Sequence, residues 1–163
     1  MLVVSDASPI RALEWVGLVH ILNSLFDRVV VPPAVAAELE RSNGPYRRIE
    51  LSRFDFIHVT QPQNPEIVLE LSHILDPGES EALALASEVP DSLLLIDEKA
   101  GRRQARKMNL HVVGTVGILV TARRRELLPA IGPILEVLRT ELRFSLSDDV
   151  IAEAVRAAGD ESV

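Results

Sequence analysis

Hydrophobic and polar positions alternate along the chain between two kinds of segment. Short, continuously apolar runs predict buried strands at 1–5, 28–32, 54–59, 93–97 and 111–114. Longer runs of mixed hydrophobic and polar residues, typical of amphipathic helices, separate them. Because strands that alternate with helices form parallel sheets covered on both faces, the pattern predicts an α/β fold. We expect a three-layer α/β/α arrangement with a mostly parallel central sheet of about five strands.

The predicted helices fall between and after these strands. They cover 9–25, 32–42, a segment ending near 76, 79–89, 99–108, 116–125, and two tail segments, one ending near 143 and one beginning near 147. Proline at the start of "PPAVAAELERS" is typical of a first helical turn, and Ser147 is a candidate N-cap. Since no repeat or long linker divides the 163 residues, we expect a single domain with a C-terminal helical tail over 129–163.

Composition narrows the class of protein. Hydrophobic residues make up 47% of the chain and aromatic residues only 4%, so the core must be built from Leu, Val, Ile and Ala. The sequence has no cysteine, which excludes disulfides, thiolate–zinc sites and cysteine nucleophiles and fits a reducing cytoplasm. No run reaches the roughly 18 apolar residues of a membrane span, and the N-terminus lacks a signal-peptide core. A soluble, cytoplasmic protein is expected.

The net charge of the chain limits how the protein can bind nucleic acid. A formal net charge of −7 argues against a broad basic surface that neutralises phosphates. It leaves room for a local site, because acids gathered in one cleft could hold divalent cations whose charge inverts the local electrostatics. Whether such a cation site can form therefore depends on where the acids lie in the fold.

Two acids directly follow predicted strands. Asp6 follows "LVVS" and Asp97 follows "LLLI". In open α/β sheets, ligands bind beyond the carboxyl ends of the strands, at the point where the strand order reverses. We therefore expect both carboxylates at one edge of the sheet, where they indicate a cation site.

Acids on predicted helices could join this site. Glu38 lies in the mostly apolar stretch "AVAAELE", where its charge would be costly to bury without a partner. Glu79 and Glu81 lie two residues apart, so on a helix they point about 200° from each other and only one can serve the site. Glu81 is favoured, because the small residues after it allow close helix packing. Glu79 suits the first helical turn, which favours acids electrostatically.

The order of "VSDAS", "AAELE", "GESEALALA" and "LLIDE" resembles that of the PIN-domain ribonucleases. "GRRQARKMNLHVVGTVGIL" is similar to a branch akin to the VapC toxins of toxin–antitoxin pairs. The resemblance covers about residues 1–125, and the tail fits more loosely. It implies an RNA-cleaving site that holds Mg²⁺ or Mn²⁺ on an acidic quartet, Asp6, Glu38, Glu81 and Asp97. It also implies a small antitoxin as partner and a homodimer.

Further positions follow from the resemblance. Ser8 stands where such proteins place a small polar residue that helps orient the first Asp, and Glu98 is a candidate for an additional acid after the last one. Thr115 is a candidate for the rim of the cleft. Common toxins of this kind carry an Asp-x-Asp-Phe-like run at the last acid, whereas "EKAGRR" follows Asp97 here, so the number of metal ions stays open.

Basic residues are candidates for RNA contact. One group, on the helix after the last acid, comprises Arg102, Arg103, Arg106 and Lys107, and a second comprises Arg123, Arg124 and Arg125. Runs of this kind are solvated helix faces by default. The four histidines lack ligand spacing and are interpreted as structural: His20, His58, His73 and His111.

Two functions of different classes remain open. The first is a metal-dependent ribonuclease that cleaves phosphodiester bonds of single-stranded or structured RNA, with a metal-bound water as nucleophile. The second is a catalytically weak module that keeps the fold for dimer or partner contacts. A phosphatase with a strand-end Asp nucleophile is disfavoured, because Ser8 stands where that chemistry usually requires a second Asp.

Overall fold

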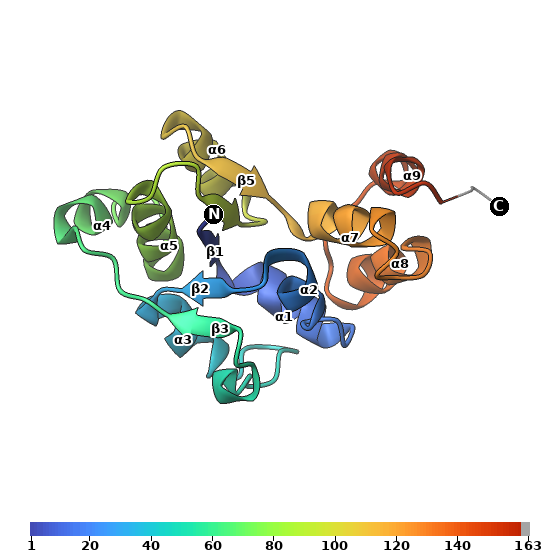
Figure 1. The fold of residues 1–163 in the computed structure, drawn as a ribbon, viewed down its shortest axis with the longest axis horizontal. Coiled ribbons are helices and arrows are strands. Elements are labelled where there is room, and N and C mark those ends of the chain that lie inside the picture. The colour runs from blue at the N-terminus through green and yellow to red at the C-terminus, as the bar shows by residue number, and fades with distance from the viewer. Residues whose placement is uncertain (161–163) are drawn as a thin grey trace.

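A single parallel sheet forms the centre of the protein, whose computed structural model describes residues 1–160 (Figure 1). Its strands are β1 (Val3–Ser5), β2 (Val29–Val31), β3 (Ile57–Val59), β4 (Leu93–Leu95) and β5 (His111–Val113). They lie in the order β3-β2-β1-β4-β5, and every pairing is parallel. The predicted five-stranded α/β/α fold is confirmed, and the strand order reverses between β1 and β4.

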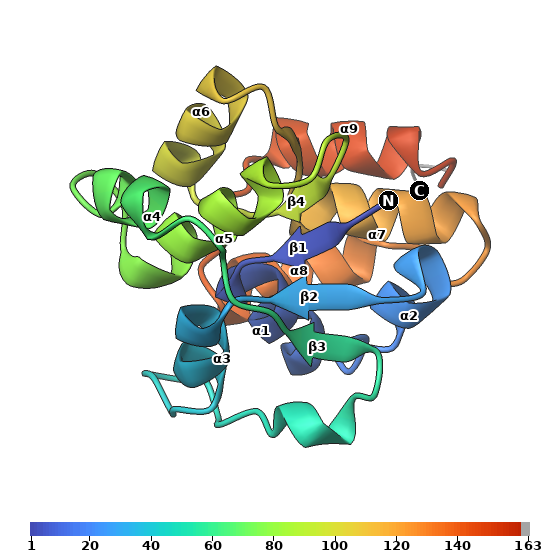
Figure 2. The same cartoon turned by 60° about the vertical axis from the view of Figure 1, so that its left-hand side comes forward.

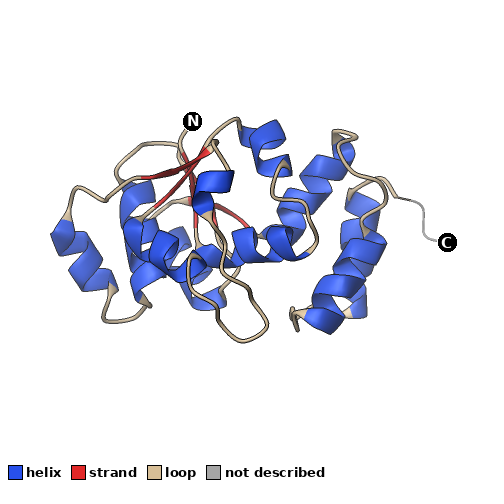
Figure 3. Cartoon of the chain, turned by 90° about the horizontal axis from the view of Figure 1, so that it is seen from below, coloured by secondary structure: helices blue, strands red, loops and turns tan. Residues whose placement is uncertain are grey.

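The strands alternate their side chains between two hydrophobic cores, because successive residues of a strand face opposite sides. Val3, Val29 and Leu95 belong to one core, whereas Val4 and Leu94 belong to the other. Helices cover both faces (Figure 3). The first core includes residues of α1 (Ala7–Trp15), α2 (Ile21–Phe26), α3 (Pro33–Leu39), α7 (Thr115–Arg124), α8 (Gly132–Glu141) and α9 (Asp148–Ala157). The second includes residues of α4 (Pro65–Leu71), α5 (Pro77–Ser87) and α6 (Lys99–Lys107).

The carboxyl ends of the central strands meet at one edge. The arrowheads of β1 and β2 point towards the side on which α3 and α5 lie (Figure 2). The ladder continues one residue beyond β1, because the N–H of Asp6 donates to the carbonyl of Leu95 at 2.9 Å. Ile96 donates in the same way to the carbonyl of Val113 at 3.0 Å. These bonds bring Asp6 and Asp97 to the edge at which the strand order reverses.

The strands are shorter than the sequence pattern predicts, and two predicted elements differ most from the structure. The helix expected over 9–25 is divided into α1 and α2, because Gly17 takes a left-handed φ of 71° and the chain turns there. The strand expected over 54–59 is reduced to β3, at the edge of the sheet, with the 3₁₀ turn Leu51–Arg53 before it.

The tail forms α8 and α9, which pack on α7 rather than on the sheet (Figure 1). Ile131, Leu135 and Leu138 are fully buried and belong to the same core as α1 and α7. The last residues of the expected tail, 161–163, lie outside the described residues. None of the helices within residues 1–160 has the length and apolar composition that a membrane-spanning segment needs.

Candidate active site

Asp6 is a buried carboxylate at the end of the central strand β1. Its side chain is 5% exposed, although it carries a charge when ionised. The pKa of Asp6 is raised to about 8, mainly by burial and also by the negative charges of Glu79, Asp76 and Glu38, while a hydrogen bond from the N–H of Ala7 acts in the opposite direction. Within the described chain, every side-chain charge that acts strongly on Asp6 is negative, so the ionised carboxylate lacks compensation.

Asp76 and Glu79 bring two more carboxylates to Asp6 through the first turn of α5. They form a capping box, in which Asp76 Oδ1 accepts from the N–H of Glu79 at 2.8 Å and Glu79 Oε2 accepts from the N–H of Asp76 at 3.3 Å. Glu79 is 7% exposed, and burial, followed by repulsion from Asp76, raises its pKa to about 7. A Cβ on Gly78 would lie 3.6 Å from both Asp6 Oδ1 and Asp76 Oδ1, so these two carboxylates flank the same backbone position.

Glu38 reaches the same group of acids from α3. It is half-buried, and its pKa is raised by burial and by repulsion from Asp76, while Arg11 and Arg41 oppose this shift. The end of α3 is held by Arg11, a buried side chain of α1 that donates from Nη2 to the carbonyls of Glu38 at 2.6 Å and Arg41 at 3.0 Å. Because α3 packs against α5, Glu38 lies near the capping box of Asp76 and Glu79.

Asp97 is fixed at the other side of the strand-order reversal by three hydrogen bonds. Its Oδ1 accepts from the N–H of Thr115 at 2.8 Å. Its Oδ2 accepts from the hydroxyls of Thr115 at 2.7 Å and Ser8 at 3.0 Å. Ser8, which the resemblance connected with the first Asp, therefore orients Asp97 in this structure, and Thr115 does so too.

Gly114 allows a close approach between Asp97 and the basic helix α6. A Cβ at this position would lie 2.9 Å from both Asp97 Oδ1 and Arg102 Nη1, closer than van der Waals contact allows. Arg102 Nη1 also donates to the carbonyl of Ile96 at 2.9 Å. Burial and the neighbouring Arg106 lower the pKa of Arg102, whereas Asp97 raises it. Of the three arginines of α6 proposed for RNA contact, Arg102 therefore lies beside Asp97.

Glu81 is directed away from this group. Its Oε2 accepts from the backbone N–H of Ala34 at 2.7 Å, in the first turn of α3. It satisfies a donor that the helix itself leaves unpaired. Asp6, Glu38 and Glu79 do not have Glu81 among the charges that shift their pKa. The structure thus brings together Asp6, Glu38 and Glu79, whereas the sequence pattern favoured Glu81 over Glu79.

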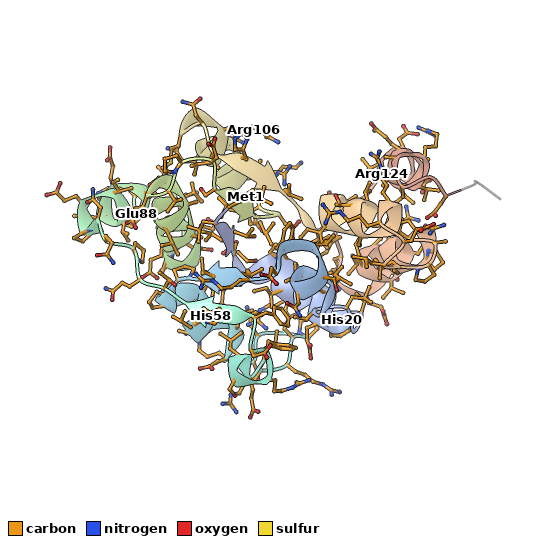
Figure 4. All side chains as sticks on the ribbon, in the orientation of Figure 1. Met1, His20, His58, Glu88, Arg106 and Arg124 are labelled. Atoms are coloured by element: carbon orange, nitrogen blue, oxygen red, sulfur yellow. The ribbon has the colours of Figure 1, made fainter. Side chains whose placement is uncertain are left out.

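The remaining candidates are exposed except Arg123, which is half-buried and forms an ion pair with Asp160. Glu98 is the N-cap residue of α6 and one of the charges that raise the pKa of Glu79. Arg103 and Arg106 lie on the exposed face of α6, and the cluster around Arg124 lies on α7, a separate part of the surface (Figure 4). His20 and His58, two of the histidines interpreted as structural, are exposed on different elements (Figure 4).

Sequence reasoning missed three residues that shape this region. Asp76 could have been found from the pattern Asp-Pro-Gly-Glu before an apolar run, which is the signature of a capping box. Arg11 and Tyr46 had no comparable local signal, because their roles depend on contacts between α1 and the segment after α3. Arg11 lies 5.1 Å from the centroid of the Tyr46 ring.

The donor chemistry of the site fits a divalent metal ion. Carboxylate oxygens are the ligands that Mg²⁺ and Mn²⁺ prefer. A divalent cation would also offset the repulsion among the buried acids around Asp6, where a positive charge would otherwise be lacking. As they stand, no three His, Asp or Glu side chains within residues 1–160 are arranged closely enough to hold an ion. Side-chain rotation would therefore have to accompany metal binding.

A parallel sheet with carboxylates gathered where its strand order reverses defines an α/β protein with a candidate ligand site at the carboxyl edge of its sheet. A family model described as a PIN domain matches residues 2–160. The chain belongs to the PIN-domain family, whose members are generally nucleases that use divalent metal ions. No curated protein gives a significant match to the sequence.

Proposed function

We propose that this protein is a ribonuclease that hydrolyses phosphodiester bonds of RNA with Mg²⁺ or Mn²⁺. The observation that carries the proposal is the group of carboxylates beside Asp6, whose ionised forms repel one another and would be stabilised by a divalent cation. Asp6 and Asp97, with Glu38 and Glu79, would hold the metal ion. Glu79 takes the place that the sequence pattern gave to Glu81, because its carboxylate acts on Asp6 while that of Glu81 caps α3.

When bound, the metal would supply an activated water and stabilise the charge that develops on the phosphate. The residues of the chain prepare this chemistry. Ser8 and Thr115 fix both oxygens of Asp97, and because Oδ2 accepts two hydrogen bonds and Oδ1 one, a single acceptor position of Oδ1 remains for a metal ion. Asp6, with a pKa of about 8, would carry a proton near neutral pH and release it when a cation binds. Arg102 adds a positive charge beside Asp97 for a phosphate of the substrate.

The proposal extends to the biological setting. We infer a toxin of a toxin–antitoxin pair, with a small antitoxin as partner, a homodimer as the assembly and the cytoplasm as the location. These inferences rest on the similarity of "GRRQARKMNLHVVGTVGIL" to the VapC-like branch, and the absence of cysteine fits the location.

A second candidate function is a catalytically weak PIN-fold module that serves dimer or partner contacts. One observation favours it: within the described residues, no three potential ligands already converge on a metal position. Under this alternative the acids would remain largely protonated or solvated, and metal would neither bind tightly nor be needed.

The deciding experiment is cleavage of a mixed RNA pool by the wild type, Asp97→Asn and the control Asp55→Asn, each with Mn²⁺, Mg²⁺ or chelator. Asp55 is an exposed acid outside the site, so the same chemical change there should have no effect. We expect metal-dependent cutting by the wild type and Asp55→Asn, and its loss in Asp97→Asn. If the wild type binds no metal in calorimetry and cuts nothing, the binding module is the better description.

A further inference from the structure

A groove of about 870 Å³ leads from the acids to the C-terminal tail. Its lining includes Ser8, Asp97 and Glu98 from the region of the acids. It also includes the segment between α8 and α9, residues 142–146, and Val150 of α9. Because the same groove is lined by Asp97 and by the tail, a molecule that reaches the acids also contacts residues that lie outside the sheet.

The groove also offers flat apolar surfaces. Tyr46 and Phe144 line it, and both rings are half-buried and pack against the main hydrophobic core. Leu142 and Leu146 flank Phe144 in the sequence and also line the groove. In a chain with only 4% aromatic residues, two rings in a groove next to the acids are a notable concentration.

Charged side chains of both signs line the groove. The acids are Asp97, a proposed metal ligand, and Glu98. The cationic side chains are Lys99, Arg102 and Arg143, and Arg143 belongs to the tail segment. Positive charges interspersed with aromatic rings match a polyanion with flat bases, which is the chemistry of a single nucleic-acid strand.

Both rings are held in place before any ligand binds. Arg143 has a left-handed φ of 55°, which turns the chain at the end of α8 so that the N–H of Phe144 donates to the carbonyl of Leu138 at 3.2 Å. On the other wall, Arg11 donates to the carbonyl of Arg47 at 3.4 Å and packs against the Tyr46 ring. Fixed rings lose little conformational freedom on binding, which favours stacking.

We propose that this groove binds a single-stranded segment of the RNA substrate next to the cleaved phosphate, with an unpaired base stacked on Phe144 and a phosphate held by Arg143. The proposal deepens the proposed ribonuclease function and rests on it. Unpaired bases can stack on aromatic side chains, whereas the bases of a duplex are already paired and stacked on each other. The tail therefore determines that the substrate is single-stranded at this position.

The test measures binding and cutting separately. Binding of labelled 12-nucleotide homopolymers, single-stranded or annealed, is followed by anisotropy with Mg²⁺ in an Asp6→Asn background, which keeps the RNA intact under the proposed function. The background is compared with added Phe144→Leu, Arg143→Gln and the control Phe26→Leu. Phe26 is half-buried against the same core but lies outside the groove, so it matches the chemical change. Thermal unfolding of each variant checks that the fold is retained.

We expect Phe144→Leu to weaken binding of single strands about tenfold, because stacking of a base on an aromatic ring is worth about 1–3 kcal/mol and about 1.4 kcal/mol corresponds to a factor of ten. Arg143→Gln should weaken it severalfold and make it less sensitive to salt. Phe26→Leu should bind like the background, and annealed duplex should compete poorly. A 2-aminopurine base near the cleavage site should be quenched by the protein with Phe144 and less so with Phe144→Leu.

Equal binding by Phe144→Leu and Phe26→Leu would overturn the proposal, and would leave the groove to a protein segment as the remaining occupant. If the wild type cuts RNA while Phe144→Leu cuts equally well, the ribonuclease function stands and the groove assignment fails. If binding depends on Phe144 but the wild type never cuts with metal, the groove assignment stands and the ribonuclease function fails.

Discussion

At the scale of single residues, two acids of one helix turn have different roles. Glu79 and Glu81 both lie in α5, about 200° apart around its axis. Glu79 faces Asp6 and forms the capping box with Asp76, whereas Glu81 faces α3 and accepts from the N–H of Ala34. The role of each carboxylate therefore depends on the groups that it faces in the fold rather than on its neighbours in the sequence.

The first prediction compares these two acids. Glu79→Gln should lower the affinity for Mn²⁺ at least about tenfold, because it removes a charged ligand from the proposed site. Glu81→Ala should leave that affinity nearly unchanged and cost about 1 kcal/mol of unfolding free energy, since it removes a partner of the first turn of α3. Titration calorimetry and urea unfolding measure the two effects. Loss of Mn²⁺ binding in Glu81→Ala alone would reverse the assignment.

A second prediction concerns Gly114. Gly114→Ala should lower cleavage at least about tenfold while the protein stays folded, because the new Cβ would meet Asp97 Oδ1 and Arg102 Nη1 at 2.9 Å and displace one of them. The matched control is Gly132→Ala, where the Cβ would make an ordinary contact of 3.7 Å with Val155. Initial cleavage rates and thermal unfolding test this. Unchanged cleavage in Gly114→Ala would show that the position of Asp97 tolerates the shift.

At the scale of elements, the tail completes the main core and one wall of the groove. α8 and α9 contact each other, and α9 also contacts α7. Their residues Ile131, Leu135 and Leu138 are fully buried, so they belong to the core as much as the strands do. The tail thereby ties the proposed substrate groove to the stability of the fold.

The third prediction follows from this packing. A chain that ends at Leu128 should lose cooperative unfolding, because each fully buried Leu or Ile contributes about 1.5–3 kcal/mol and a domain has only about 5–15 kcal/mol in total. Leu138→Ala, a milder change, should cost about 2–5 kcal/mol. Circular dichroism melts of both chains provide the measurement. A truncated chain that melts at the temperature of the full chain would show that the tail is dispensable for the fold.

At the scale of the whole molecule, several of the acids that make the formal net charge negative lie in the proposed site. The net charge is −7, and the buried carboxyls of Asp6 and Glu79 have pKa values raised to about 8 and about 7. A carboxyl whose pKa is higher in the folded than in the unfolded chain holds its proton more tightly when folded. Stability then falls as pH rises.

The fourth prediction is a pH dependence with this sign. For Asp6, the free energy of unfolding without metal should decrease as pH rises from about 4, near the ordinary pKa of 3.8, to about 8, the folded-state value. Asp6→Asn should flatten this decrease, because the amide cannot ionise. Mn²⁺ should raise the melting temperature of the wild type at pH 8 and that of Asp6→Asn much less. Parallel metal-free curves for both proteins would show that Asp6 is not the titrating group.

The sequence by itself determined the features that depend on local pattern. Apolar runs such as "LLLI" predicted buried strands between two layers, and the acids after them, Asp6 and Asp97, were expected at the carboxyl edge of the sheet. Strand and helix lengths were less certain, because the turn at Gly17 and the short β3 depend on what packs against them.

Only the tertiary structure decided which side chains meet. Ser8 and Asp97 lie 89 positions apart and are joined by a hydrogen bond. Glu79 rather than Glu81 acts on Asp6, because Glu81 accepts a hydrogen bond from the N–H of Ala34 at the start of α3. The groove likewise brings Asp97 beside Phe144, on segments that no local pattern connects. Periodicity along the chain fixes which face of an element is buried, whereas the partners across that face depend on how all the elements pack together.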